Sequence, residues 1–131
     1  MAKATSVAVI VVDDTGKLEP VQAVRATPGS TVLFVMSNEH ATHDFKVEFK
    51  DFKRKETAAA ALPIQGAASH FRRLSPGEVD TVKVKMRPTG DFGSGAGLLP
   101  YTTYKYTVEV TDLTAGTAAV PTDPDLDVPP I

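Results

Sequence analysis

The chain has 131 residues, the length of one domain, and it can bury a single hydrophobic core without disulfides or a structural metal. Hydrophobic residues make up 42% of it and charged residues 23%, and the net charge of −2 argues against a general nucleic-acid binder. Because the sequence has no cysteine, we exclude disulfide scaffolds, cysteine nucleophiles, cysteine-ligated zinc and the blue-copper site, which needs a thiolate.

The first part of the chain predicts three strands. Residues 7–12 form a continuous and largely β-branched run, typical of a strand covered on both faces. Residues 21–26 alternate weakly, and residues 31–37 predict another apolar strand. Between these two, Pro28 and Gly29 fit the central positions of a type II turn, because proline presets the first φ and glycine adopts the positive second one. We therefore expect a hairpin-like pair around this turn.

Residues 43–50 alternate between apolar and polar side chains, a pattern typical of a half-buried strand. Phe45, Phe49 and Phe52 also lie at i, i+4 and i+7, so a helix is the competing interpretation. We favour a strand that ends at Phe49 and then a short helix within residues 51–62, where an alanine-rich run has high helix propensity.

Two further strands have clear alternation. A Ser-Pro-Gly-Glu turn at 75–78 precedes a strand over residues 82–86, and residues 104–110 alternate best of all. The glycine-rich residues 93–97 predict a flexible connection rather than a phosphate loop, because a strand and not a helix follows them.

Six or seven short strands separated by turn signals predict an all-β fold, an antiparallel Greek-key β-sandwich with one short helix between its middle strands. We assign residues 1–112 to this domain. Residues 113–131 are rich in Pro, Thr, Ala and Asp, and we expect an acidic extension on the surface that is partly disordered.

The N-terminal apolar run is too short for a signal peptide, and no run of eighteen apolar residues could span a bilayer. We therefore expect a cytoplasmic protein. The alternative is a chain from which a leader has been removed.

Four motifs together resemble the cupredoxin family over residues 7–111. They are the Pro28-Gly29 turn with its strand, Asn38 followed by His43-Asp44-Phe45, Leu74-Ser75-Pro76-Gly77, and Tyr104-Lys105-Tyr106. In that family, copper is held by one histidine after the asparagine-containing strand and by a Cys…His…Met loop after the Tyr-x-Tyr strand. The resemblance implies the cupredoxin fold and places His43 at the first histidine. No cysteine, histidine or methionine follows Tyr106, so the resemblance does not extend to blue-copper electron transfer.

His40 and His43 are the candidate metal ligands. On a loop both can reach one ion, whereas on a strand they would face opposite sides. With Met36 or Glu39 nearby, two imidazoles can hold Cu(II) or Zn(II) weakly. Alternatively, both are exposed loop histidines, or one holds a turn by a hydrogen bond. Since His70 is distant in sequence, we expect no cofactor, with copper or zinc as the alternative.

Other combinations of polar residues have simpler interpretations. Ser69 and His70 are mere neighbours, and no Gly-x-Ser-x-Gly elbow exposes a serine, so we do not expect an enzyme. The alternating Asp123, Asp125 and Asp127 could bind calcium, but the glycine and glutamate of a helix-loop-helix calcium site are missing. An acidic, solvated tail is the expectation.

Charge is unevenly distributed along the chain. Residues 46–87 hold ten Lys/Arg against five Asp/Glu, whereas four aspartates and no basic residue follow Val110. The basic segment fits an acidic partner or a phosphate-rich polymer. It equally fits a solvated face, or a patch that the chain's own acidic tail covers.

These patterns predict a non-enzymatic binding or assembly module on a cupredoxin-like scaffold without a blue-copper site. We expect a protein partner or self-association as a homodimer through one sheet, no membrane partner and no nucleic acid. The alternative is a weak copper- or zinc-binding protein that uses His43 with His40.

Overall fold

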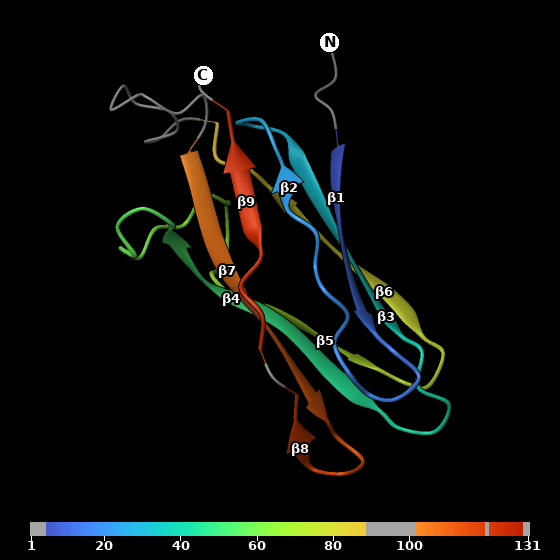
Figure 1. Cartoon of the computed structure of the whole chain (residues 1–131). Coiled ribbons are helices and arrows are strands. Elements are labelled where there is room, and N and C mark those ends of the chain that lie inside the picture. The colour runs from blue at the N-terminus through green and yellow to red at the C-terminus, as the bar shows by residue number, and fades with distance from the viewer. Residues whose placement is uncertain (1–4, 89–101, 120, 130–131) are drawn as a thin grey trace.

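The computed structural model describes residues 5–88, 102–119 and 121–129, which form two β-sheets packed face to face (Figure 1). The predicted all-β sandwich is therefore confirmed. The glycine-rich residues 93–97 lie outside the described ranges. The strands are β1 (Thr5–Val12), β2 (Val24–Arg25), β3 (Thr31–Asn38), β4 (Phe45–Arg54), β5 (His70–Leu74), β6 (Val79–Lys85), β7 (Thr102–Asp112), β8 (Thr117–Ala118) and β9 (Asp125–Val128).

The smaller sheet has the strand order β1-β3-β6, and the larger sheet has the order β2-β9-β7-β4-β5, with β8 paired to β7. Strand β1 runs parallel to β3 and β2 runs parallel to β9, whereas the other ladders are antiparallel. Both sheets are therefore mixed. The predicted antiparallel pairing is found in five of the seven ladders of the described residues, whereas β1 and β2 each enter a sheet beside a strand that runs in the same direction.

The turn predicted at Pro28 and Gly29 is present, but it does not close a hairpin. The Ser30 N–H donates to the Thr27 carbonyl at 3.1 Å, and Gly29 has a φ of 76°, as a type II turn requires. Strand β2 before the turn pairs with β9 in the larger sheet, whereas β3 after it belongs to the smaller sheet. The turn carries the chain from one layer to the other, so the predicted hairpin-like pair is wrong.

Alternation predicts the inward side of the longer strands correctly. Phe45, Val47 and Phe49 of β4 are buried, as are Val82 and Val84 of β6. Strand β7 likewise buries the apolar half of its alternating series. Each of these strands therefore presents one apolar side to the space between the sheets.

The helix predicted within residues 51–62 is wrong, and the described residues contain no helix. Strand β4 continues to Arg54 and buries Phe52. The alanine-rich run lies beside β4 instead: Ala61 N–H donates to the Phe52 carbonyl at 3.2 Å, and Arg54 N–H donates to the Ala59 carbonyl at 2.9 Å. Pairing with β4 and burial of the phenyl ring thus outweigh the helix propensity of alanine.

Since the described part of the chain is entirely strands, turns and loops, it includes no helix long and apolar enough to cross a membrane.

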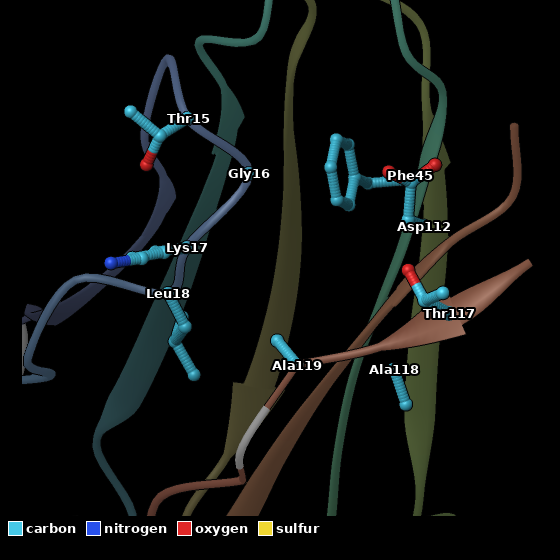
Figure 2. Close-up of a pocket in the computed structure, with 9 residues that line it drawn as sticks. All are labelled: Thr15, Gly16, Lys17, Leu18, Phe45, Asp112, Thr117, Ala118 and Ala119. Carbon is cyan, nitrogen blue, oxygen red and sulfur yellow. The ribbon is translucent and has the colours of Figure 1, made fainter. Parts of the chain in front are cut away.

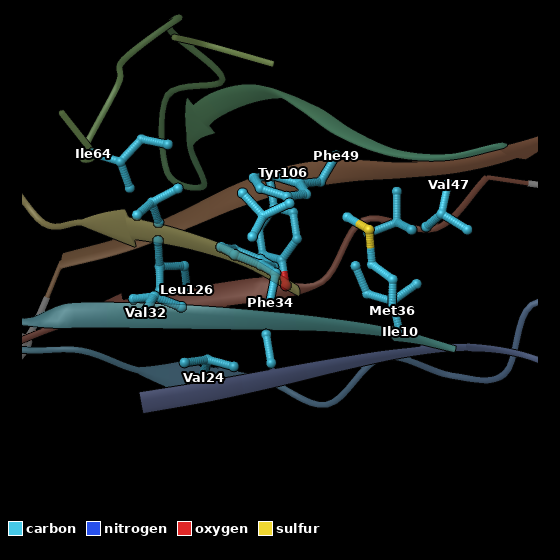
Figure 3. Close-up of a cluster of buried hydrophobic side chains, with 14 of the residues drawn as sticks. Ile10, Val24, Val32, Phe34, Met36, Val47, Phe49, Ile64, Tyr106 and Leu126 are labelled. Atoms are coloured by element: carbon cyan, nitrogen blue, oxygen red, sulfur yellow. The ribbon is translucent and has the colours of Figure 1, made fainter. Parts of the chain in front are cut away.

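A cluster of aromatic rings joins the two sheets (Figure 3). Phe34 of β3 stacks on Phe49 of β4 with ring centroids 3.9 Å apart, and Tyr106 of β7 meets Phe34 edge-on at 5.7 Å. Phe52 stacks on Tyr106 at 5.4 Å. Tyr106 is only 1% exposed, and its hydroxyl has no hydrogen-bond partner among the residues that the structure describes. The Tyr106 hydroxyl is therefore an unpaired polar group within an apolar part of the core.

The C-terminal residues are not simply an extension on the surface. Asp125–Val128 form β9, which lies between β2 and β7 in the larger sheet (Figure 1). Leu126 and Val128 are buried, because the alternation that turns Asp125 and Asp127 outward turns these two side chains inward. The expectation of a surface extension is wrong for this strand, which completes both the sheet and the core.

Candidate functional site

The two candidate histidines lie on the loop between β3 and β4 with their rings side by side. The ring centroids of His40 and His43 are 4.1 Å apart, with 28° between the ring planes. The Phe45 ring lies 5.8 Å from the His40 ring. The fold thus brings these two sequence-predicted residues together.

Buried Asn38, at the end of β3, anchors this loop. Its side-chain amide donates to the His43 carbonyl at 2.8 Å and approaches the Leu74 and Ser75 carbonyls at 3.2 and 3.1 Å. Its side-chain oxygen accepts the His40 N–H at 3.0 Å. Asn38 thereby fixes the histidine loop to the turn between β5 and β6.

His40 uses a ring nitrogen to hold the same loop. The backbone N–H groups of Thr42 and His43 donate to His40 Nδ1 at 3.2 and 3.0 Å. An imidazole nitrogen that accepts hydrogen bonds carries no proton, so in neutral His40 the proton lies on Nε2. Nε2 then has no lone pair for a metal, and ligation there would require His40 to give up both loop hydrogen bonds.

His43 is oriented by Asp112, a residue that the sequence analysis did not single out. His43 Nδ1 lies 2.7 Å from Asp112 Oδ2, while Asp112 Oδ1 accepts the backbone N–H groups of Thr114 and Ala115 at 3.0 and 2.8 Å. Burial raises the pKa of the Asp112 carboxyl, but the Ala115 amide and the His43 imidazole outweigh it and leave the pKa below its ordinary value. An ionised carboxylate only accepts, so His43 Nδ1 donates and its Nε2 lone pair remains available when the ring is neutral.

A cavity of about 450 Å³ lies next to this cluster (Figure 2). It is lined by Thr15, Gly16, Lys17, Leu18, Phe45, Asp112, Thr117, Ala118 and Ala119. Figure 2 shows the Lys17 side chain directed away from the Phe45 ring, whereas Asp112 and Thr117 lie beside that ring, so the cavity wall is mixed in polarity. A Cβ on Gly16 would lie 3.2 Å from Phe45 Cζ, and Gly16 has a φ of 84°. Glycine therefore lets this turn close against the phenyl ring.

The other proposed metal ligands do not join the histidine pair. Met36 is fully buried in the core, whereas Glu39 is exposed. His70 stacks on Phe49 at 5.1 Å, and its Nε2 lies 3.1 Å from the Ala67 carbonyl. In the described ranges, no three His, Cys, Asp or Glu side chains gather in a way that could hold an ion.

The C-terminal aspartates bind groups of their own chain. Asp123 accepts the Thr107 hydroxyl at 3.0 Å, and Asp127 accepts the Thr103 hydroxyl at 2.8 Å. Asp125 forms ion pairs with Lys55 at 2.9 Å and with Lys105 at 2.8 Å. Burial raises the pKa of Asp125, but the two ammonium groups outweigh it and leave the pKa below its ordinary value. Part of the basic segment is thus covered by the acidic strand, one of the three alternatives left open by the sequence.

The outer face of the larger sheet is polar and cross-linked by ion pairs, and we call it the charged face. It includes the pairs that Asp125 makes and those of Lys50. Lys50 Nζ lies 2.6 Å from Glu109 and 3.5 Å from Glu48, and the Glu109 carboxylate raises the pKa of Lys50 despite some desolvation. Lys46 Nζ lies 4.8 Å from the centroid of the Phe71 ring. Most of these charges have a partner within the sheet.

The outer face of the smaller sheet carries an apolar patch instead, beside polar positions that include Thr81, Lys83 and Lys85. We call this patch the valine face, and it consists of Val7, Val9 and Val11 of β1, Leu33 and Val35 of β3, and Val79 of β6. Val7, Val9 and Val79 are 51%, 49% and 58% exposed. The expectation that residues 7–12 form a strand covered on both faces is therefore wrong. Periodicity could not reveal this, since a β-branched run suits a strand whether or not anything covers its second face.

Both edges of the smaller sheet are partly occupied by the chain itself. Along β1, Glu19 N–H donates to the Val11 carbonyl at 2.9 Å, and the Ser6 hydroxyl donates to the Arg25 carbonyl at 2.6 Å. Along β6, Gln65 N–H donates to the Lys85 carbonyl at 2.8 Å. The chain therefore occupies one end of each edge, at Val11 on β1 and at Lys85 on β6.

No protein-family model matches the chain, and no curated protein matches it. Among solved structures, the chain is similar to Na-dithionite-reduced auracyanin from the photosynthetic bacterium Roseiflexus castenholzii. The two share 11% identity with a TM-score of 0.45, and the match covers 99% of this chain and 100% of that one. A likeness this low transfers neither ligand nor activity to this chain.

Proposed function

We propose that the protein is a non-enzymatic docking module, without a blue-copper site, that binds a protein partner through the valine face. The observation that supports this is the contrast between the two outer faces of the sandwich. Paired charges cover one, whereas the other presents six aliphatic side chains, three of them about half exposed. A contiguous apolar patch on a protein surface typically marks a site of interaction.

The free energies favour docking at the valine face over the charged face. Full burial of a valine side chain contributes about 1.5–3 kcal/mol, so covering the exposed half of Val7, Val9 or Val79 contributes about 1 kcal/mol each. Covering the charged face would instead remove Lys50 and Glu109 from water, a desolvation that the ion pair scarcely repays. A partner therefore gains most by packing on the valine face.

The test is the binding of an apolar fluorescent dye to the native protein at a concentration too low for self-association. We expect the wild type to bind the dye, and a variant with Val7→Thr, Val9→Thr and Val79→Thr to lose that binding while it keeps its circular dichroism spectrum. Threonine retains the β-branched shape, so strand propensity changes little. A matched control, Thr111→Ser on β7, should bind the dye like the wild type. Equal dye binding by wild type and triple variant would refute the proposal.

A second candidate function is weak copper or zinc binding, and it is favoured by the Asp112–His43 contact of 2.7 Å. A carboxylate that accepts from one ring nitrogen fixes the other as a ligand, as is common at metal sites. The resemblance of the histidine segment to the cupredoxin motif supports the same residue. His40 is the weaker candidate ligand, because its Nδ1 already accepts two backbone hydrogen bonds.

Calorimetric titration with Cu(II) and Zn(II) separates the two functions. The docking module should show no stoichiometric binding tighter than micromolar. Binding that disappears in His43→Ala, with folding intact, would make metal handling the leading function. His40→Ala tests the second ligand: retained affinity would identify His43 as the ligand that matters.

A further inference from the structure

We infer that the partner of the valine face is a second copy of this chain, packed face to face about a twofold axis that runs along β3. This inference rests on the proposed docking function and names its partner. It is carried by the shape of the valine face, by the placement of its charges and by the occupied edges of the smaller sheet.

The shape of the valine face suits another sheet. Strands β1 and β3 each have eight residues, so the face is about 26 Å long, and three strands make it about 14 Å wide. Its side chains form rows across the strands, with Val7 opposite Leu33 and Val9 opposite Val35. Two such ridged faces pack with their strands nearly aligned, about 10 Å apart. A second copy presents the same dimensions and the same rows.

The charges of the face select the direction of the axis. Lys83 and Lys85 lie outward on β6, whereas the outward positions of β1 carry no charge. An axis along β3 places β6 of one copy over β1 of the other, so the lysines of the two copies lie at opposite edges. There the aliphatic lysine stems cover valines while the ammonium groups reach water. An axis across the strands would gather all four lysines at one edge.

The partly occupied edges disfavour the other common arrangement of sheet proteins, in which two sheets join edge to edge. Joining two sheets edge to edge requires free backbone groups along β1 or β6. The Val11 carbonyl and the Lys85 carbonyl already accept hydrogen bonds from Glu19 and Gln65. Face-to-face packing leaves these hydrogen bonds intact. The face is about 26 Å by 14 Å, so two copies bury about 730 Å² of facing surface, less than the roughly 1,200 Å² of a stable specific interface, and we expect a weak, reversible dimer with a dissociation constant of hundreds of micromolar.

The first experiment is sedimentation velocity of the full chain from low micromolar to near-millimolar concentration. We expect reversible growth from monomer to dimer. Val9→Lys and, separately, Val79→Lys should each weaken dimerisation at least tenfold, because the twofold axis buries every substitution twice. Both positions are about half exposed, so the monomer should remain folded. A matched control, Thr111→Lys on the outer face of the larger sheet, should leave the dimer unchanged.

The second experiment tests the axis and uses the absence of cysteine from the sequence. Facing sheets are too far apart for a direct disulfide, so a short bifunctional maleimide is the probe. Val35→Cys, at the centre of β3, should cross-link to itself. Val9→Cys and Thr81→Cys occupy the same row on β1 and β6, and they should cross-link mainly when the two proteins are mixed. Efficient self-cross-linking of Val9→Cys would overturn the proposed axis.

A wild type that stays monomeric at every concentration, or a dimer insensitive to both lysine substitutions, would overturn the inference. The dye experiment then separates it from the docking function. Dye binding that is lost in the triple threonine variant would keep the docking function and assign the face to a different protein. If neither the wild type nor the triple threonine variant binds the dye, both the docking function and the proposed dimer are refuted.

Discussion

Tyr106 places a hydroxyl group in the middle of an apolar core, where no described residue forms a hydrogen bond with it. Leaving a buried hydroxyl unpaired costs about 1–3 kcal/mol. Its ring nevertheless packs against Phe34 and Phe52. The side chain therefore stabilises the core through its ring and destabilises it through its oxygen.

Replacing the phenol by a phenyl ring should separate these two effects. We expect Tyr106→Phe to raise the free energy of unfolding by about 1 kcal/mol, because the unpaired hydroxyl is removed and the ring is kept. Tyr106→Ala removes the ring and should lower it by about 3–5 kcal/mol. Urea denaturation measures both changes. A clear loss of stability in Tyr106→Phe would mean that the hydroxyl has a partner.

The same residue should make stability sensitive to alkaline pH. Burial raises the pKa of Tyr106 above its ordinary value of 10.0. The unfolded chain therefore loses this proton at a lower pH than the folded protein, so the free energy of unfolding should fall as the pH rises above 10.0. Tyr106→Phe lacks this contribution. Urea denaturation of both proteins between neutral and alkaline pH should show a shallower loss in the variant.

At the histidine loop, the sequence predicts that His40 and His43 can meet, but it does not predict the contact between His43 and Asp112. The spacing of His40 and His43 is enough to suggest that their rings can meet on a loop. Asp112, which orients His43, is 69 residues away from it in sequence. Only the pairing of β4 with β7 brings the two together. A single sequence carries no signal for that contact beyond a polar residue at a strand end.

At the scale of elements, β9 connects the acidic end of the chain to the core. Leu126 is 1% exposed between the sheets. We expect Leu126→Ala to lower the free energy of unfolding by about 2–5 kcal/mol, the usual range for a leucine deleted from a core. Leu113→Ala is the matched control, because Leu113 is 41% exposed and its loss should change stability little. Similar small effects for both variants, measured by urea denaturation, would contradict the burial of β9.

The outer side of β9 should contribute to stability in acid. Lys105 and Lys55 outweigh burial and hold the pKa of Asp125 below its ordinary 3.8. This contribution is complete above 3.8 and is lost as the pH falls through the lower pKa of the folded protein. Asp125→Asn should therefore be less stable than the wild type at neutral pH, and the difference should shrink below pH 3.8. Thermal unfolding across that range measures it, and a constant difference would contradict the ion pairs.

A strand can be predicted from the sequence when its alternation of apolar and polar residues is long enough. The strands that contain Phe45, Val82 and Tyr106 alternate over several residues, and their inward sides were predicted correctly. In β9 the same alternation spans only four residues in a proline-rich segment, where composition suggests disorder instead. The helix prediction for the alanine-rich run after β4 was wrong for another reason. Backbone pairing with Phe52 overrides the helix propensity of alanine.

At the scale of the molecule, the two outer faces should respond to salt in opposite ways. Salt screens the ion pairs of the charged face, whereas it does not weaken apolar packing, and sulfate strengthens it. We therefore expect the dissociation constant of the dimer to stay constant or to decrease when sodium sulfate is added, as measured by sedimentation. A dissociation constant that rises steeply with salt would place the interface on the charged face.

The position of β9 also determines when the fold can form during synthesis. Val24 of β2 pairs with Leu126 of β9, which follows it by about a hundred residues. A ribosome adds about 5–20 residues per second, so β2 emerges and waits for several seconds before its neighbour exists. The smaller sheet, which ends with Lys85, has all its strands well before then. For that interval only β4 and β5 of the larger sheet are available to cover the inner face of the smaller sheet, since β7 and β9 come later in the chain, and it is then that we expect chaperones to bind the nascent chain.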